Sequence, residues 1–65
     1  MRIIVNGDTR EVATPVLAEV LAELGYAGAV VATAVNESFV PTGARARTIL
    51  ADGDRLEILA PMQGG

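Results

Sequence analysis

The first apolar positions alternate over a short stretch and then stop at a turn. Arg2–Val5 is branched and apolar, which is typical of a strand, and Ile3 and Val5 share the face that we assign to the core. Asn6-Gly7 follows, and this dipeptide is a strong signal for a type I′ hairpin turn. The sequence therefore predicts an antiparallel hairpin whose second, more solvated strand is Thr9–Val12.

The next segment repeats its apolar residues at the spacing of a helix. They lie three and four residues apart and form one stripe, at Val16, Leu17, Val20, Leu21 and Leu24. Thr14 is placed to cap the helix, and Pro15 suits its first position. Gly25 can end it in a left-handed conformation. We expect one amphipathic helix here, with its apolar stripe against the core.

Two further strands and a crossover follow the helix. Ala29–Val35 is an apolar run broken only by a threonine, which favours a strand covered on both faces. Phe39-Val40 is predicted to form a short strand that ends at Pro41. The mixed stretch 42–50 predicts an irregular crossover that contains at most one helical turn and places Ile49 and Leu50 inward.

The final strand is predicted by strict alternation. After a tight turn at 52–54, the run Arg55–Leu59 places Leu56 and Ile58 on the core face and Leu59 on the opposite face. The resulting order is strand, strand, helix, strand, short strand, strand. This order predicts an α+β domain over residues 1–65, in which a mixed sheet of four to five strands packs on one main helix.

Composition narrows the function classes. Apolar residues make up 51% of the chain, cysteine and histidine are absent, and the net charge is −3. Five scattered arginines are the only cations, which argues against a nucleic-acid partner. The longest uncharged stretch, Tyr26–Asn36, is well short of the roughly 20 residues of a membrane helix. We expect a cytoplasmic protein with no membrane partner and no metal site.

The last two residues, Gly64-Gly65, are the first candidate for function. Without a Cβ they make a thin segment that can enter a narrow channel. The Gly65 α-carboxylate, with an ordinary pKa of roughly 3.3–3.7, is ionised at neutral pH. We interpret residues 61–65 as a flexible tail that presents this carboxylate to other proteins. The alternative is a frayed terminus without a role.

Side-chain chemistry offers weaker candidates. Asp52, Asp54 and Glu57 lack the spaced oxygen ligands of a calcium loop and fit turn formation and a solvated strand face better. Thr33 and Ser38 have no histidine, cysteine or lysine to activate them as nucleophiles. The sequence therefore favours a protein that is not an enzyme.

A third candidate is an apolar contact surface beside the tail. Leu59, Met62 and Phe39 are apolar, and Leu59 falls on the face opposite the core residues of its strand. Exposed apolar residues that gather on one face mark docking surfaces. We expect these three residues to contact a partner; the alternative is that they pack under the sheet.

Three segments together resemble one family. Val35–Pro41 contains an Asn-x-x-x-Val-Pro pattern, Asp52–Ile58 begins with Asp-Gly-Asp, and the chain ends Gln63-Gly64-Gly65. At these spacings the sequence is similar, over essentially its whole length, to the thiamine-biosynthesis sulfur carriers, the ThiS family. The resemblance implies the β-grasp fold of ubiquitin-like proteins.

The resemblance also implies a reaction sequence. A ThiF-type adenylyltransferase, using ATP and magnesium, would adenylate the Gly65 carboxylate. Sulfur from a donor protein would replace the adenylate and give a thiocarboxylate, and thiazole synthase (ThiG) would receive that sulfur. Gly65 would carry the sulfur and Gly64 would give it access, while the domain itself would bind no cofactor.

Other functions remain open at this point. The nearest is the small subunit of molybdopterin synthase (MoaD-like), which resembles ThiS in fold and in its terminal diglycine but is usually longer. A ubiquitin-like modifier would attach the same carboxylate to a lysine of another protein. A plain interaction domain would need no tail at all.

Overall fold

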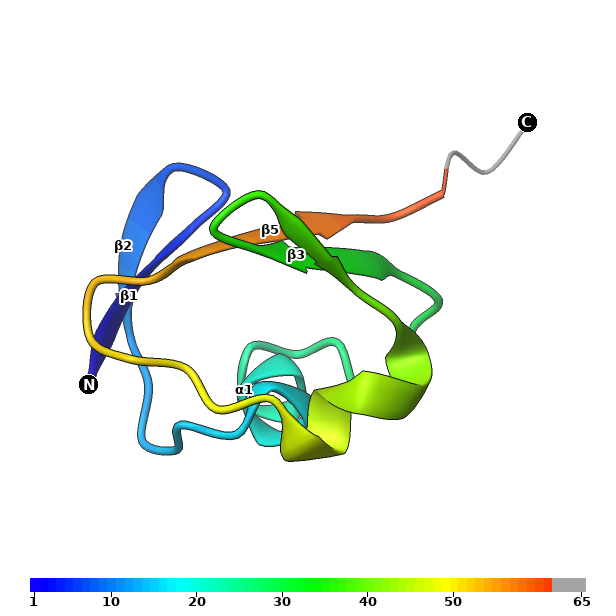
Figure 1. Cartoon of the computed structure of the whole chain (residues 1–65), viewed down its shortest axis with the longest axis horizontal. Helices are drawn as coiled ribbons and strands as arrows, with labels where there is room; N and C mark the ends of the chain where they lie inside the picture. The colour runs from blue at the N-terminus through cyan, green and yellow to red at the C-terminus, as the bar shows by residue number, and fades with distance from the viewer. Residues whose placement is uncertain (62–65) are drawn as a thin grey trace.

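A five-stranded mixed sheet and two helical segments make up the computed structural model, which describes residues 1–61. The elements in order are β1 (Arg2–Val5), β2 (Asp8–Glu11), α1 (Leu17–Glu23), β3 (Ala32–Val35), β4 (Ser38–Val40), the 3₁₀ helix η1 (Thr42–Arg47) and β5 (Arg55–Leu59). The strand order is β2-β1-β5-β3-β4, with β1 and β5 parallel and the other pairs antiparallel. Both α1 and η1 lie on one side of the sheet (Figure 1). The predicted α+β architecture, a mixed sheet packed on one main helix, is confirmed.

Two asparagines open the two hairpin turns. Asn6 has φ 49° and Gly7 has φ 88°, the pair of positive values that a type I′ turn requires. Val5 pairs with Asp8 across this turn, so the predicted hairpin is confirmed. Asn36 (φ 48°) and Glu37 (φ 72°) repeat the same geometry between β3 and β4. The second turn therefore places a glutamate where glycine is the usual residue.

The strain at Glu37 predicts a stability difference between two variants. Glu37→Gly and Glu37→Ala both remove the exposed, 4.0 Å pair with Arg55, but only glycine adopts the positive φ without a steric penalty. We expect Glu37→Gly to be more stable than Glu37→Ala by about 1 kcal/mol. Urea denaturation measures the difference. Equal stabilities would show that the backbone at this position carries no strain.

Helix α1 begins two residues later than the sequence predicts. Val16 is extended (φ −80°, ψ 123°) and forms a β-bridge with Ile49, while the Leu50 amide donates to the Pro15 carbonyl at 2.7 Å. This pairing with a distant segment holds residues 15–16 out of the helix. Thr14 does not cap α1, and its hydroxyl instead accepts a bond from the Val16 amide at 3.2 Å. The predicted start was wrong because a long-range contact overrides the local signal.

The end of α1 follows the prediction. Gly25 has φ 95°, and the Tyr26 amide donates to the Leu21 carbonyl at 2.8 Å. The Gly25 amide also donates to the Ala22 carbonyl at 3.1 Å. This is the bond pattern of a helix closed by a left-handed residue.

Two expectations about burial were wrong. β3 starts only at Ala32 and is covered on one face, because α1 and η1 both lie on the same side of the sheet (Figure 1). Thr33 is its core-facing residue, at 2% exposure, and Val30 before it is 80% exposed. Ile49 is 64% exposed, since it alternates with Leu50 in an extended segment and only Leu50 points inward.

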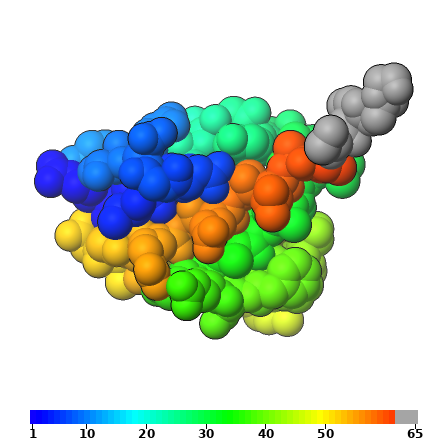
Figure 2. Space-filling view, turned by 90° about the horizontal axis from the view of Figure 1, so that it is seen from above, coloured from blue at the N-terminus to red at the C-terminus, as the bar shows by residue number. Residues whose placement is uncertain are grey.

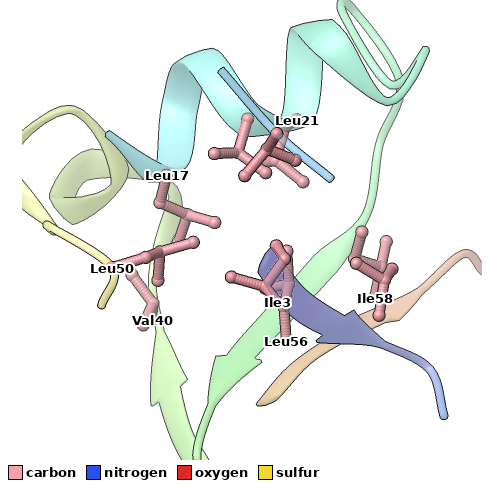
Figure 3. Close-up of a cluster of buried hydrophobic side chains, with 10 residues drawn as sticks. Ile3, Leu17, Leu21, Val40, Leu50, Leu56 and Ile58 are labelled. Carbon is pink, nitrogen blue, oxygen red and sulfur yellow. The ribbon is translucent and has the colours of Figure 1, made fainter. Parts of the chain in front are cut away.

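The core fills the space between the sheet and the helical layer (Figure 3). Its buried residues are Ile3, Val5, Val12, Leu17, Val20, Leu21, Val40, Leu50, Leu56 and Ile58. Leu17 and Leu21 of α1 point toward Ile3, Leu56 and Ile58 of the central strands (Figure 3). Neither helical segment within residues 1–61 has the length and apolarity needed to cross a membrane.

Candidate functional site

β5 carries the chain out of the core toward the C-terminus. It lies between β1 and β3 at the centre of the sheet (Figure 1). Its last residue, Leu59, is in register with Ala32. Ala60 and Pro61 continue beyond the strand. Three of the predicted functional residues, Met62, Gly64 and Gly65, lie outside the described part of the chain. Only the first residue of the predicted tail 61–65 lies within it.

The side chain of Asn6 fixes β5 on the β1 side. Its amide nitrogen donates to the Ile58 carbonyl at 3.1 Å, and its amide oxygen accepts from the Ile58 amide at 2.8 Å. The parallel β1–β5 register ends at Val5 and Leu56, so Asn6 extends the ladder beyond the end of β1. Local reasoning identified Asn6 as a turn residue only, because its partner is 52 residues away.

Asn36 does the same on the other side of β5. Its amide oxygen accepts from the Arg55 amide at 2.9 Å, and its amide nitrogen donates to Asp54 Oδ1 at 3.0 Å. The asparagine of the Asn-x-x-x-Val-Pro pattern is thus bonded to the second aspartate of the Asp-Gly-Asp segment. Together with Asn6, this contact fixes the strand that leads to the C-terminal residues from both of its neighbours.

Asp54 is held as a carboxylate by these bonds. The Ala51 amide donates to Asp54 Oδ2 at 2.8 Å and Asn36 donates to Oδ1, and both bonds lower the pKa of Asp54 below its ordinary 3.8. Asp52 Oδ1 likewise accepts from the Arg2 amide at 2.8 Å. Both carboxylates therefore build the turn before β5, as expected for turn-forming aspartates.

The lowered pKa of Asp54 predicts a loss of stability in acid. Because its pKa is lower in the folded state, the unfolded state binds the proton more readily. Its contribution to stability is present above the unfolded pKa, near 3.8, and disappears as the pH falls through the folded pKa. We expect the free energy of unfolding to decrease over this window less in Asp54→Asn than in wild type. A matched Asp8→Asn variant loses a carboxylate on β2 that accepts no hydrogen bond within residues 1–61. Identical pH profiles for Asp54→Asn and wild type would contradict the assignment.

The face of the sheet opposite the helices is apolar around the end of β5. We call this region the apolar sheet surface, formed by Val30, Ala32, Phe39, Leu59, Ala60 and Pro61. Phe39 is 69% and Leu59 72% exposed. Shallow grooves on both sides of Leu59 connect these residues. Figure 2 looks onto this face, with β5 (orange) running between the β1–β2 hairpin (blue) and β3–β4 (green).

The structure brings two of the three predicted contact residues together. Phe39 and Leu59 line one groove with Ala32, while Met62 lies outside the described residues. Sequence reasoning missed Val30, which it assigned to a covered strand, and Glu57, which it treated as an ordinary solvated residue. The alternation in β5 already placed Glu57 on the same face as Leu59, so that signal was available.

Thr33 does not act as an exposed nucleophile. Its hydroxyl donates to the Val40 carbonyl at 2.9 Å and accepts from Arg45 Nε at 3.1 Å, inside the core. Arg45 also donates to the Val31 carbonyl at 2.6 Å, so it fastens η1 to the start of β3. This polar group is structural. Among residues 1–61 the candidate functional feature is therefore the apolar sheet surface, which lies where the chain leaves the sheet.

Comparisons with known proteins agree with this geometry. A family model described as the ThiS family matches residues 3–65. A crystal structure of the thiamine biosynthesis protein (ThiS) from Geobacter metallireducens has 32% identity and a TM-score of 0.81, with all of each chain covered. A thiazole synthase of Paramagnetospirillum magneticum is 36% identical over a match 66 positions long, which covers 100% of this chain but only 20% of that protein. The chain thus spans about a fifth of the length of this curated relative. The match over nearly its whole length shows that the chain belongs to the ThiS family of thiamine-biosynthesis sulfur carriers.

Proposed function

We propose that the chain delivers sulfur to the thiazole of thiamine through the carboxylate of Gly65. The carboxylate attacks the α-phosphorus of ATP on a ThiF-type adenylyltransferase, forms an acyl-adenylate and releases pyrophosphate, with magnesium held by that enzyme. The terminal sulfur of a persulfide on a donor protein then displaces AMP and gives an acyl disulfide. A thiol attacks the donor's sulfur and breaks the S–S bond, which leaves the thiocarboxylate and a new disulfide on the donor side. Thiazole synthase (ThiG) takes the sulfur, and the domain acts as a substrate and not as a catalyst.

The observation that carries this proposal is the family match that extends to Gly65, on a chain whose central strand leads out of the core to Pro61. If residues 61–65 extended fully, they would span about 16–18 Å, which is enough to enter an enclosed active site while the domain stays outside. Enclosure matters because the acyl-adenylate and the thiocarboxylate must be protected from water. Gly64 leaves room at the narrowest part of such a channel.

The position of the apolar sheet surface supports separate roles for the domain, which binds the partner, and for the tail, which carries the sulfur. It borders the point where the chain leaves β5, so a protein that receives the tail also covers Leu59 and Phe39. The relative named thiazole synthase is consistent with an acceptor of that class, because a segment like this chain forms part of that protein. Recognition then depends on the folded surface, and the transferred atom depends on Gly65.

The two alternatives differ in the fate of the carboxylate. A molybdopterin synthase subunit gives the same thiocarboxylate but passes its sulfur to a different product. A ubiquitin-like modifier gives an amide with a lysine of another protein, and hence a ladder of larger conjugates. The ThiS family match favours the thiazole branch over both.

Intact-mass spectrometry tests the proposal. The chain is isolated from cells that contain the activating enzyme, the sulfur donor and thiazole synthase, and again from cells that lack the activating enzyme. We expect a species heavier by one sulfur less one oxygen in the first sample only, with fragmentation placing the change on Gly65. Conjugates without this species would favour the modifier, and an unmodified chain in both samples would reject the proposal.

Leu59→Glu tests whether the apolar sheet surface contacts the activating enzyme. Leu59 is 72% exposed, so a charge there leaves the core intact but brings an unpaired carboxylate into an apolar contact. We expect the Kd for the enzyme to rise by about tenfold or more, with an unchanged circular dichroism spectrum. Thr9→Glu, on the exposed edge strand β2, is the matched control and should leave Kd unchanged. Loss of helical and sheet signal in Leu59→Glu would show instead that Leu59 belongs to the core.

A further inference from the structure

One carboxylate beside the apolar sheet surface has no partner among residues 1–61. Glu57 is exposed at the middle of β5, in register with Ala34, which is itself in register with Phe39. It therefore shares the face of Phe39 and Leu59 and lines the same groove. Within residues 1–61 its side chain makes no hydrogen bond or ion pair.

The nearby cations are engaged elsewhere. Arg55, two residues before Glu57 on the same face, lies 4.0 Å from Glu37. Arg45 donates to Thr33 and Val31 beneath the sheet, and Arg2 pairs with Glu11 at 3.2 Å. Arg55 lines a groove together with Glu57, but within residues 1–61 no ion pair forms between them.

A partner that covers the apolar sheet surface must also compensate the negative charge of Glu57. A protein that packs against Phe39 and Leu59 removes water from Glu57, because Glu57 lines the same groove and lies two residues before Leu59 on the same face of β5. A buried carboxylate without a cation is strongly unfavourable, whereas one that meets an arginine or lysine in good geometry is tolerated and selects its partner. Charge complementarity therefore favours a partner that has a cation opposite Glu57.

We propose that Glu57 is a specificity-determining residue, and that the activating enzyme places an arginine or lysine against it when it docks on the apolar sheet surface. The protein that we expect to cover the apolar sheet surface is the activating enzyme. It must accept an ionised carboxylate, from a domain with net charge −3, next to ATP, and a cationic surround lowers the repulsion between them. This inference rests on the proposed function and adds the pairing partner of its docking surface.

Binding at two salt concentrations tests the pairing. Calorimetry with the ThiF-type enzyme of the same organism compares wild type, Glu57→Gln and Glu57→Lys with the matched pair Asp8→Asn and Asp8→Lys on β2. We expect Glu57→Lys to raise Kd about tenfold or more and Asp8→Lys less than about twofold. Glu57→Gln should raise Kd less than Glu57→Lys and should make binding less dependent on salt, which Asp8→Asn should not do.

Each other result has a definite meaning. If wild type binds and is adenylated while the Glu57 variants match the Asp8 variants, Glu57 has no pairing role and the inference is wrong. If Glu57→Gln keeps wild-type Kd but self-associates, Glu57 only keeps this surface soluble, which also overturns the inference. If wild type neither binds nor is adenylated, the proposed function itself fails, and the inference fails with it.

Discussion

Removal of Gly65 is expected to abolish thiocarboxylate formation while leaving the domain folded and bound to its activating enzyme. The shortened chain still ends in a carboxylate, that of Gly64, but this group falls about 3.3 Å short of the α-phosphorus of ATP. A misplacement of only 1 Å can cost about 100-fold in rate, so we expect adenylation to fall by more than that factor. Pyrophosphate exchange measures adenylation, and calorimetry measures binding.

A control variant of unchanged length separates the effect of the length of the C-terminal segment from the effect of its amino-acid composition. Gln63→Ala alters the same segment but keeps the Gly65 carboxylate at its original distance from the domain. We expect this variant to be adenylated at close to the wild-type rate. If the chain without Gly65 is adenylated as fast as Gln63→Ala, the carboxylate of Gly65 is not the acceptor of the adenylate.

Leu56→Ala is expected to have the largest effect on the fold. Leu56 is fully buried on the core face of β5, paired with Val5 on one side and Val35 on the other. Truncating a buried leucine costs about 2–5 kcal/mol. A chain of 65 residues has only about 3–10 kcal/mol of stability, so a large fraction of it is lost. Urea denaturation should show a transition shifted to much lower concentration, or no folded baseline.

Leu59→Ala is the matched control on the same strand. It removes the same atoms three residues later, from a side chain that is exposed on the apolar sheet surface. We expect a loss below about 0.5 kcal/mol, as for ordinary surface substitutions. Comparable losses in the two variants would contradict the division of β5 into a core face and a contact face.

Local patterns predicted the parts of the fold that depend on neighbouring residues. The alternation of Arg55–Leu59 gave the bounds of β5 and the direction of its side chains, and Asn6-Gly7 gave the first hairpin. The helical stripe gave the buried face of α1. In each case the residues that decide the structure lie within a few positions of one another, so the sequence alone carries the information.

The errors arose where distant segments meet. The start of α1 depends on the bridge between Val16 and Ile49, and the one-sided cover of β3 depends on where α1 and η1 pack. The bond between Asn6 and Ile58 spans 52 residues and has no local signal. The same limit applies to the candidate site: the alternation in β5 places Glu57 on the face of Leu59, but only the sheet register shows that Phe39 lies beside them.

The most direct test of the central claim adds one residue to the chain. A variant with a single phenylalanine after Gly65 keeps the fold, the apolar sheet surface and both glycines, but its carboxylate belongs to a bulky residue beyond the proposed position. Intact-mass spectrometry after expression with the complete sulfur-transfer proteins reports both trimming and sulfur incorporation. We expect a full-length chain with no sulfur and no thiazole product. Thiazole formation by the untrimmed variant would contradict the proposal that Gly65 carries the sulfur.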